Sequence, residues 1–256
     1  MAIELLVLTS AVAFVAVGAG VGAKLLWLAR RTRGFPELVV GFSLFVLAGV
    51  AWPLLLFASA PTPPPGPWLR AALAVAAAGM AMGWAGVFLF TWRVFRPTHA
   101  WGRALAVAGM AVELAAGLAG VIRAVRLDDA LALRSPSPSG FVLLLGALCA
   151  YVWTAVESFH YRALLRRRVP LGLADPLVAE RFGLWGWTSV FAAGSIAPAT
   201  WAMVTGGDPN SPLSHLVVGV CGLASSAALY LAFLPPAAYT RYVRESAPAV
   251  APEVGP

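Results

Sequence analysis

A single carboxyl group lies in the middle of an otherwise uncharged apolar run. Glu113 is found within AVAGMAVELAAGLAGV, near the centre of a predicted membrane helix. An ionised carboxylate at that depth of a bilayer costs about 2.5–3.5 kcal/mol or more, so we expect Glu113 to be protonated or hydrogen bonded inside the protein. Two roles fit this residue: a ligand, proton or cation site, or a neutral acid that holds two helices together.

A second group of polar and aromatic side chains occupies the apolar run over residues 183–204. Indole and hydroxyl groups suit a mostly apolar or amphipathic ligand that needs a few hydrogen bonds. With Glu113, the candidate ligand-binding residues are Trp185, Trp187, Thr188, Ser195 and Trp201. Ser225 and Ser226 add small polar positions on the next apolar run. Plain helix packing explains the same residues equally well.

Two prolines interrupt apolar runs at interior positions. Pro53 and Pro198 each remove one backbone hydrogen bond, which kinks a membrane helix unless neighbours or water satisfy the freed carbonyl. We expect these residues to act as hinges beside a cavity, because paired helix interruptions mark binding sites in membrane transporters.

The densest group of arginines separates two apolar runs. It lies in the stretch over residues 157–187, and its candidate interaction residues are Arg166, Arg167, Arg168 and Arg181. Basic residues between membrane helices are typical of cytoplasmic loops, so the sequence predicts a cytoplasmic loop here that is able to meet a protein partner.

Two further features belong to this predicted loop. Asp175 and Pro176 can begin a short amphipathic helix on the membrane surface. Glu157 lies just inside the preceding helix, and we expect it to pair with Arg162 or Arg166.

Several chemistries need residues that the chain lacks or places far apart. Lys24 is the only lysine and lies in the first apolar run, so the last helix has no Schiff-base lysine. Haem held by two histidines needs imidazoles that face each other within the bundle, but His99 and His160 are predicted at the cytoplasmic side and His215 at the outer edge. The same scatter excludes a three-histidine zinc site. No nucleotide-binding or hydrolase motif occurs. We expect no enzymatic activity, no metal and no cofactor.

The composition is that of a membrane protein. Of 256 residues, 60% are hydrophobic and 11% are charged, against about 25% charged in soluble domains. We predict an all-α integral membrane protein of seven transmembrane helices, one domain over residues 1–240. The helices are expected over residues 3–28, 38–57, 68–94, 104–122, 141–164, 183–204 and 213–238.

The distribution of basic residues predicts the orientation. Fourteen of them fall in the tail and one set of loops, whereas the other set holds only Arg70, Arg123, Arg126 and Arg134. The positive-inside rule then places the N-terminus outside and the C-terminus in the cytoplasm, with residues 241–256 as a disordered tail. Arginine outnumbers lysine 17 to 1, which is typical of a GC-rich bacterial genome and favours the bacterial inner (plasma) membrane. The scattered charge favours contact with anionic lipid over nucleic acid.

Two segments of the chain match each other. GFSLFVLAGVAWP (41–53) aligns without a gap on GWTSVFAAGSIAP (186–198). The identical pairs are Gly41 and Gly186, Ala48 and Ala193, Gly49 and Gly194, and Pro53 and Pro198. The match predicts two parallel three-helix units, residues 3–94 and 141–238, joined by a linker helix over residues 104–122.

This 3+1+3 plan, with its N-terminus outside, resembles that of the SWEET sugar carriers and their PQ-loop relatives. The resemblance implies a carrier that exposes one site to each side in turn. The chain departs from the family pattern because no Pro-Gln pair occurs at the helix ends and the first and fifth helices lack prolines. We therefore transfer no site residue from that family.

Three functions are compatible with the sequence. We favour a receptor-like or sensory protein that binds a small apolar or amphipathic ligand between the kinked helices and shifts the arginine-rich loop. The first alternative is a small carrier built on the 3+1+3 repeat. The second is a non-catalytic structural subunit that packs against another membrane protein.

Overall fold

The computed structural model is all-helical over the residues that it describes, 2–60, 62, 66–126, 137–208 and 211–246. The first half contains α1 (Ala2–Thr32), α2 (Phe35–Val46), the π-helical turn η1 (Leu47–Ala51), α3 (Trp52–Ala58), α4 (Gly66–Phe95) and α5 (Ala100–Arg126). The second half contains α7 (Pro138–Arg168), the 3-10 turn η2 (Val169–Leu171), α8 (Pro176–Thr205), α9 (Pro212–Phe233) and α10 (Ala237–Glu245).

Six helical segments are long and apolar enough to cross a membrane. They are Ile3–Thr32, Phe35–Ala58, Gly66–Phe95, Ala100–Arg126, Pro138–Leu171 and Pro212–Phe233. At 30 residues α8 has the length but is not among them, because tryptophan, glycine, serine and threonine lower its hydropathy. The prediction of an all-α, multi-pass membrane-type protein is therefore confirmed, and a seventh crossing stays a prediction.

Proline, glycine and capping residues set the helix boundaries. Three helices begin with a proline and are preceded by a residue whose side chain accepts a hydrogen bond from a backbone N–H of the first turn. These capping residues are Ser137 for α7, Asp175 for α8 and Ser211 for α9. Gly172 and Gly206 follow η2 and α8 with positive φ angles of 68° and 70°, a conformation that favours glycine. The reversals of the chain are thus encoded locally.

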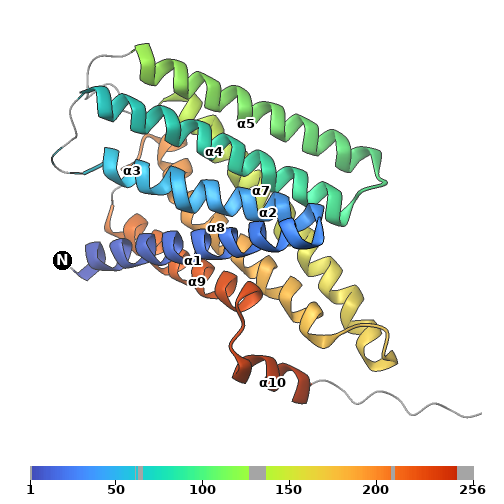
Figure 1. Cartoon of the computed structure of the whole chain (residues 1–256). Helices are drawn as coiled ribbons and strands as arrows, with labels where there is room; N and C mark the ends of the chain where they lie inside the picture. The colour runs from blue at the N-terminus through green and yellow to red at the C-terminus, as the bar shows by residue number, and fades with distance from the viewer. Residues whose placement is uncertain (1, 61, 63–65, 127–136, 209–210, 247–256) are drawn as a thin grey trace, which may run out of the picture.

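The long helices run antiparallel to their neighbours in sequence (Figure 1). The segments α2, η1 and α3 follow one another as a single helical rod, Phe35–Ala58. With this rod named by α2, six rods form a closed ring, in which α1 packs on α2, α2 on α4, α4 on α7, α7 on α8, α8 on α9 and α9 on α1. The helix α5 lies outside this ring against α4 and α7. The C-terminal ends of α1, α4 and α7 and the N-terminal ends of α2, α5 and α8 lie at one end of the bundle. We call it the arginine-rich end, since most described arginines lie there.

Close approach of α1 and α2 depends on two glycines. A methyl group on Gly22 would lie 2.6 Å from the Phe45 backbone nitrogen, and one on Gly41 would lie 2.8 Å from the Leu26 backbone nitrogen. Neither backbone can move aside cheaply, so these residues let the two helices meet without intervening side chains.

The last long helix ends earlier than the sequence predicts. It stops at Phe233, before Pro235 and Pro236, and α10 follows as a separate helix. Consecutive prolines remove two N–H donors and exclude the helical conformation for the residue before them. Residues 241–245, predicted as disordered tail, belong to α10, and residues 247–256 lie outside the described part of the chain.

The arginine-rich segment is more helical than predicted. The helix α7 continues through Arg168, and α8 already begins at Pro176. Asp175 does cap a helix, but that helix is the start of α8 and not a separate surface element. No proline or glycine interrupts residues 164–168, so helical hydrogen bonding extends to the 3-10 turn before Gly172.

Candidate functional site

An axial cavity lies inside the ring of six helical rods. Its larger part measures about 130 Å³ and its smaller part about 30 Å³. Both parts are bordered by Phe14, Tyr151, Ala192 and Ser225, so they adjoin each other. The lining residues belong to the ring helices, and none of them belongs to α5. The described lining of the cavity therefore comes from the ring alone.

The π-helical turn before Pro53 shapes one wall of this cavity. Proline has no N–H and cannot continue the α-helical hydrogen-bond pattern. The Trp52 N–H instead donates to the Leu47 carbonyl, five residues earlier, which is the spacing of a π-helix. Leu47 borders the smaller part of the cavity and Trp52 the larger part. Pro198, the other predicted hinge, lies within the uninterrupted helix α8.

Hydroxyl groups give the apolar wall a few hydrogen-bond acceptors. Ser195 Oγ donates to a carbonyl of its own helix at 2.8 Å, and Ser225 Oγ on α9 donates to a carbonyl of α8 at 3.0 Å. Each oxygen keeps lone pairs after donating its proton. Tyr151 and Trp84 also border the larger part of the cavity. A ligand with a hydroxyl or amine donor has acceptors available in this wall.

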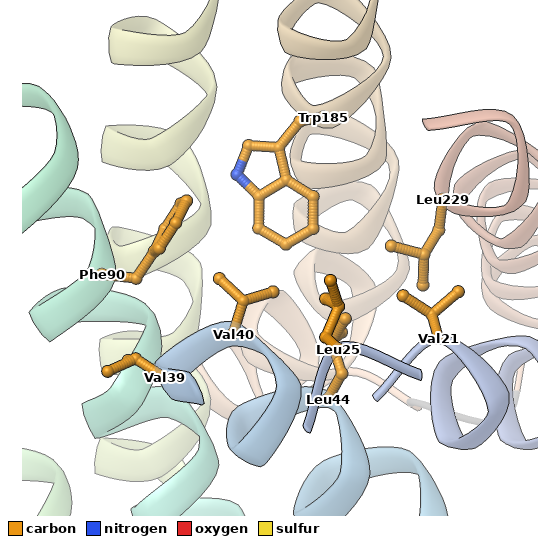
Figure 2. Close-up of a cluster of buried hydrophobic side chains, with 8 residues drawn as sticks. All are labelled: Val21, Leu25, Val39, Val40, Leu44, Phe90, Trp185 and Leu229. Atoms are coloured by element: carbon orange, nitrogen blue, oxygen red, sulfur yellow. The ribbon is translucent and has the colours of Figure 1, made fainter. Parts of the chain in front are cut away.

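Trp185 separates the axial cavity from the arginine-rich end. Its side chain is 8% exposed and packs edge to face on Phe90 at 5.8 Å and on Phe233 at 5.4 Å. Figure 2 shows its six-membered ring above Val40, with the indole nitrogen pointing to the side on which Phe90 lies. We call the surrounding apolar cluster the plug; its buried members are Val21, Leu25, Val39, Val40, Leu44, Phe90, Trp185 and Leu229.

The indole N–H of Trp185 has no hydrogen-bond acceptor among the described residues. A buried donor without a partner costs about 1–3 kcal/mol. Because Trp185 borders the smaller part of the axial cavity, an acceptor group on a bound molecule would remove this cost. The cavity is thus bordered at one end by a tryptophan whose donor has no acceptor among the described residues, and along its wall by hydroxyl acceptors.

Equivalent positions within and directly before the two matched segments border the same cavity. On α2 and η1 the lining residues are Val40, Ser43, Leu44 and Leu47, and on α8 they are Trp185, Thr188, Ser189 and Ala192. Each residue of the first set lies 145 positions before its counterpart, which is the offset of the sequence match. Ser43 donates to the Val39 carbonyl at 2.8 Å, and Thr188 donates to the Leu184 carbonyl at 2.9 Å. The two segments present the same face inward.

The structure divides the predicted ligand-binding residues into two groups. Trp185, Thr188 and Ser195 border the axial cavity. Trp187 and Trp201 are 48% and 70% exposed on the outer face of α8. Residues two apart on a helix differ by about 200° in direction, so Trp185 and Trp187 point to opposite sides.

Glu113 lies between α5 and α7, away from the axial cavity. It is 0% exposed, and neither carboxyl oxygen has a hydrogen-bond partner among the described residues. It faces Gly146 of α7, where an added methyl group would overlap Oε1. The structure therefore separates Glu113 from the indole and hydroxyl groups with which it was predicted to act.

Two carboxylate–arginine contacts hold the arginine-rich end together. Glu157 accepts hydrogen bonds from Arg96 Nε at 2.8 and 2.9 Å and from Trp153 Nε1 at 3.3 Å, which ties α7 to the end of α4. The hydrogen bond with Glu157 raises the pKa of the Arg96 guanidinium above its ordinary value. Glu180 accepts two hydrogen bonds from Arg162, at 2.8 and 3.0 Å, and so ties α8 to α7.

The predicted partners of Glu157 are wrong. Arg162 and Arg166 lie five and nine residues further along α7, and five residues turn a helix by about 140° beyond a full turn. Both arginines instead approach Glu180, with Arg166 Nε at 3.7 Å. The other arginines predicted to meet a partner are exposed; they are Arg167, Arg168 and Arg181.

No known protein family matches the chain, and neither a curated protein nor a solved structure matches it. Among the described residues, no three His, Cys, Asp or Glu side chains gather closely enough to hold a metal ion. The fold and the site define the class directly: an all-α bundle of the multi-pass membrane type, with a mostly apolar cavity on its axis.

Proposed function

We propose that the protein is a receptor-like membrane protein whose axial cavity binds a small, mostly apolar molecule with one hydrogen-bonding group. The observation that carries this proposal is the buried indole N–H of Trp185, a residue that borders the cavity and whose donor has no partner among the described residues. Ser195 and Ser225 supply acceptors in the same cavity. A small alcohol can satisfy both kinds of group at once.

The volume of the cavity limits the size of this molecule. The larger part, at about 130 Å³, is close to an engineered cavity of about 150 Å³ that binds benzene or xenon. The ligand is therefore expected to be no larger than a single six-membered ring with a small substituent, unless the plug moves.

In our proposal α8 completes a seven-helix membrane bundle. It is free of charged residues from Phe182 to Thr205, and it packs between α7 and α9, which both have membrane-spanning character. The excess of arginine at one end favours a cytoplasmic location for that end, an outside N-terminus and a bacterial inner membrane.

The helix α8 offers a direct route from the ligand to the arginine-rich end. Trp185 and Glu180 lie five residues apart on α8, and Glu180 is bound to Arg162 of α7. A ligand that displaces Trp185 changes the position of α8 relative to α7 at this ion pair. We infer that the exposed arginines beside it form the surface that a cytoplasmic partner reads.

A pair of matched ligands and a pair of matched variants test the binding step. Cyclohexanol should raise the melting temperature of the purified protein more than methylcyclohexane does, since only the alcohol can hydrogen bond. Ala192→Leu, which fills the cavity, should abolish this difference. Ala197→Leu lies on the exposed face of α8 and should preserve it. Equal shifts in all three proteins would show that cyclohexanol acts on the detergent and would refute the site.

The receptor role needs a second readout at the arginine-rich end. Cyclohexanol should change the rate of amide hydrogen exchange around η2 and the first turn of α8, and Ala192→Leu should prevent this change. Binding without any change at that end would refute signalling through α8 while leaving the cavity as a binding site.

We propose a carrier as the second candidate, because equivalent positions of the matched segments border one cavity. The neighbour relations are symmetric as well: α1–α2, α2–α4 and α1–α9 correspond to α7–α8, α8–α9 and α7–α4. Such symmetry is typical of carriers with repeated units.

Alternating access makes a specific labelling prediction. A cysteine introduced at Ser43, with Cys149 and Cys221 replaced by alanine, should react with an impermeant maleimide from both faces of a proteoliposome. Pro53→Ala should slow the reaction from one face by removing the hinge. Reaction from one face only would reject the carrier in favour of the receptor.

A further inference from the structure

A separate cavity lies on the other side of the plug, at the arginine-rich end. It measures about 490 Å³ and shares Phe90 and Trp185 with the axial cavity. Its walls come from α1, α2, α4, α8 and α9. We call it the vestibule. Its volume lies within the range of about 300–1,000 Å³ that is typical of small-molecule sites.

The vestibule combines apolar walls with a charged rim. Lys24, Glu37 and Arg181 border it; the lysine and the arginine are exposed, and Glu37 is half-buried. Lys24 Nζ donates to the Phe233 carbonyl in the last turn of α9 at 3.3 Å, and an ammonium group has two further donors. The rim thus carries two positive charges and one negative charge around an otherwise apolar space.

This chemistry fits an amphiphile with an anionic headgroup. A lysine and an arginine extend apolar stems along a membrane helix and place their charged groups at the interface. Basic pockets between membrane helices at the cytoplasmic side are typical binding sites for anionic lipid headgroups. The apolar walls, which end at the rings of Phe90 and Trp185, suit the first part of an acyl chain.

We propose that the vestibule binds an anionic phospholipid of the surrounding leaflet, with its phosphate between Lys24 and Arg181 and an acyl chain directed toward the plug. Glu37 opposes this binding and limits its strength. The site does not depend on what the axial cavity binds. Because Trp185 borders both cavities, a lipid in the vestibule also supports the plug from the arginine-rich side.

Native mass spectrometry of the intact protein released from detergent micelles tests the proposal. The probes are phosphatidylglycerol, phosphatidylcholine of the same chains, oleate and inorganic phosphate. We expect retention of phosphatidylglycerol above phosphatidylcholine. Removal of one basic group near a membrane surface weakens lipid binding about fivefold, so Lys24→Gln and Arg181→Gln should each lower that retention by about this factor.

Three further variants separate binding from folding. Glu37→Gln should raise retention of phosphatidylglycerol, an effect that damage to the fold does not produce. Lys24→Arg keeps the charge and should retain the lipid. Arg30→Gln removes an exposed charge from the same helix, outside the vestibule, and should leave retention unchanged.

Several results would overturn the proposal. Equal retention of the two phospholipids by the native protein would remove the anionic site. An equal loss in Arg30→Gln would assign it to general surface charge. Retention of oleate without phosphatidylglycerol would identify a free fatty acid as the occupant, and binding of phosphate alone would show that the apolar walls contribute nothing.

Discussion

Gly146 and Glu113 form a contact whose energy is measurable by a double-mutant cycle. The Glu113 carboxyl group is fully buried, and an added methyl group at Gly146 would overlap it. Because the carboxyl group lies where the new methyl group would be, Gly146→Ala in the native background must either displace the Glu113 side chain or separate α5 from α7. Truncation by Glu113→Ala removes the obstacle.

The magnitude follows from two opposing effects. Overpacking a well-packed site costs about 1–3 kcal/mol, whereas replacing glycine with alanine inside a helix gains about 1 kcal/mol. Gly146→Ala should therefore destabilise the native protein but stabilise the Glu113→Ala protein. The coupling energy between the two positions should be about 1–3 kcal/mol, since neighbours in contact commonly couple by about 0.5–3 kcal/mol.

Thermal unfolding of the four proteins in one detergent measures the coupling. For a chain of this length each kcal/mol shifts the melting temperature by about 2–4 °C. Glu113→Gln keeps the shape of the side chain and should preserve the coupling, which separates steric contact from charge. Additive effects of Gly146→Ala and Glu113→Ala would refute the tight contact between α5 and α7.

Three other perturbations have defined outcomes. Glu157→Ala should destabilise the protein by about 1–3 kcal/mol, since it removes the carboxylate that accepts hydrogen bonds from Arg96 and Trp153; chemical unfolding measures this loss. Gly22→Ala should cost about 1–3 kcal/mol by thermal unfolding, because the added methyl group meets the backbone of α2. Burial raises the pKa of the Tyr239 phenol on α10, so this phenol is deprotonated at a lower pH in the unfolded chain than in the folded protein. Above the ordinary tyrosine pKa, deprotonation therefore favours release of α10 from α8, and hydrogen exchange of α10 should become faster.

Matched variants control each of these experiments. Gly20→Ala should be neutral or slightly stabilising, because no atom of the described residues beyond the helix's own backbone and the chain neighbours lies within 4 Å of the new methyl group. Arg96→Ala combined with Glu157→Ala should cost less than the sum of the single changes, and additive costs would exclude the ion pair. Tyr239→Phe should remove the alkaline weakening of α10, and its persistence would assign the effect to another group.

The helices were predictable because their signals are local. Apolar runs, prolines and glycines fixed the number of long helices and most of their ends. The predicted helix ends were wrong where the sequence contains no helix-breaking proline or glycine, or where two prolines follow each other. Residues 164–168 contain no proline or glycine, so α7 continued beyond its predicted end, and the Pro235–Pro236 pair ended α9 early.

The composition of the cavity wall was only partly predictable. Apolar residues surround every membrane helix, so the sequence does not indicate which side faces the axis. Trp185 and Trp187 looked alike, yet only Trp185 points inward. The repeat offered a better guide, because Ser43 and Thr188 are matched and both border the cavity. Tyr151 was missed, although a phenol hydroxyl in the middle of an apolar run was a usable signal.

Glu113 shows a different limit of sequence reasoning. Its burial was predictable from the apolar run around it. Its direction was not, because it depends on where α5 packs relative to the ring. The structure places α5 outside the ring, and the carboxyl group therefore meets α7 instead of the axis.

An electron density or cryo-EM map of the protein extracted gently from its own membrane tests the central claim most directly. We predict density for a small non-protein molecule in the axial cavity, within hydrogen-bond distance of the Trp185 indole nitrogen. A map in which the side chains of Leu47, Ala192 and Trp185 close over this space, or in which the indole donates to another protein group, would contradict the claim.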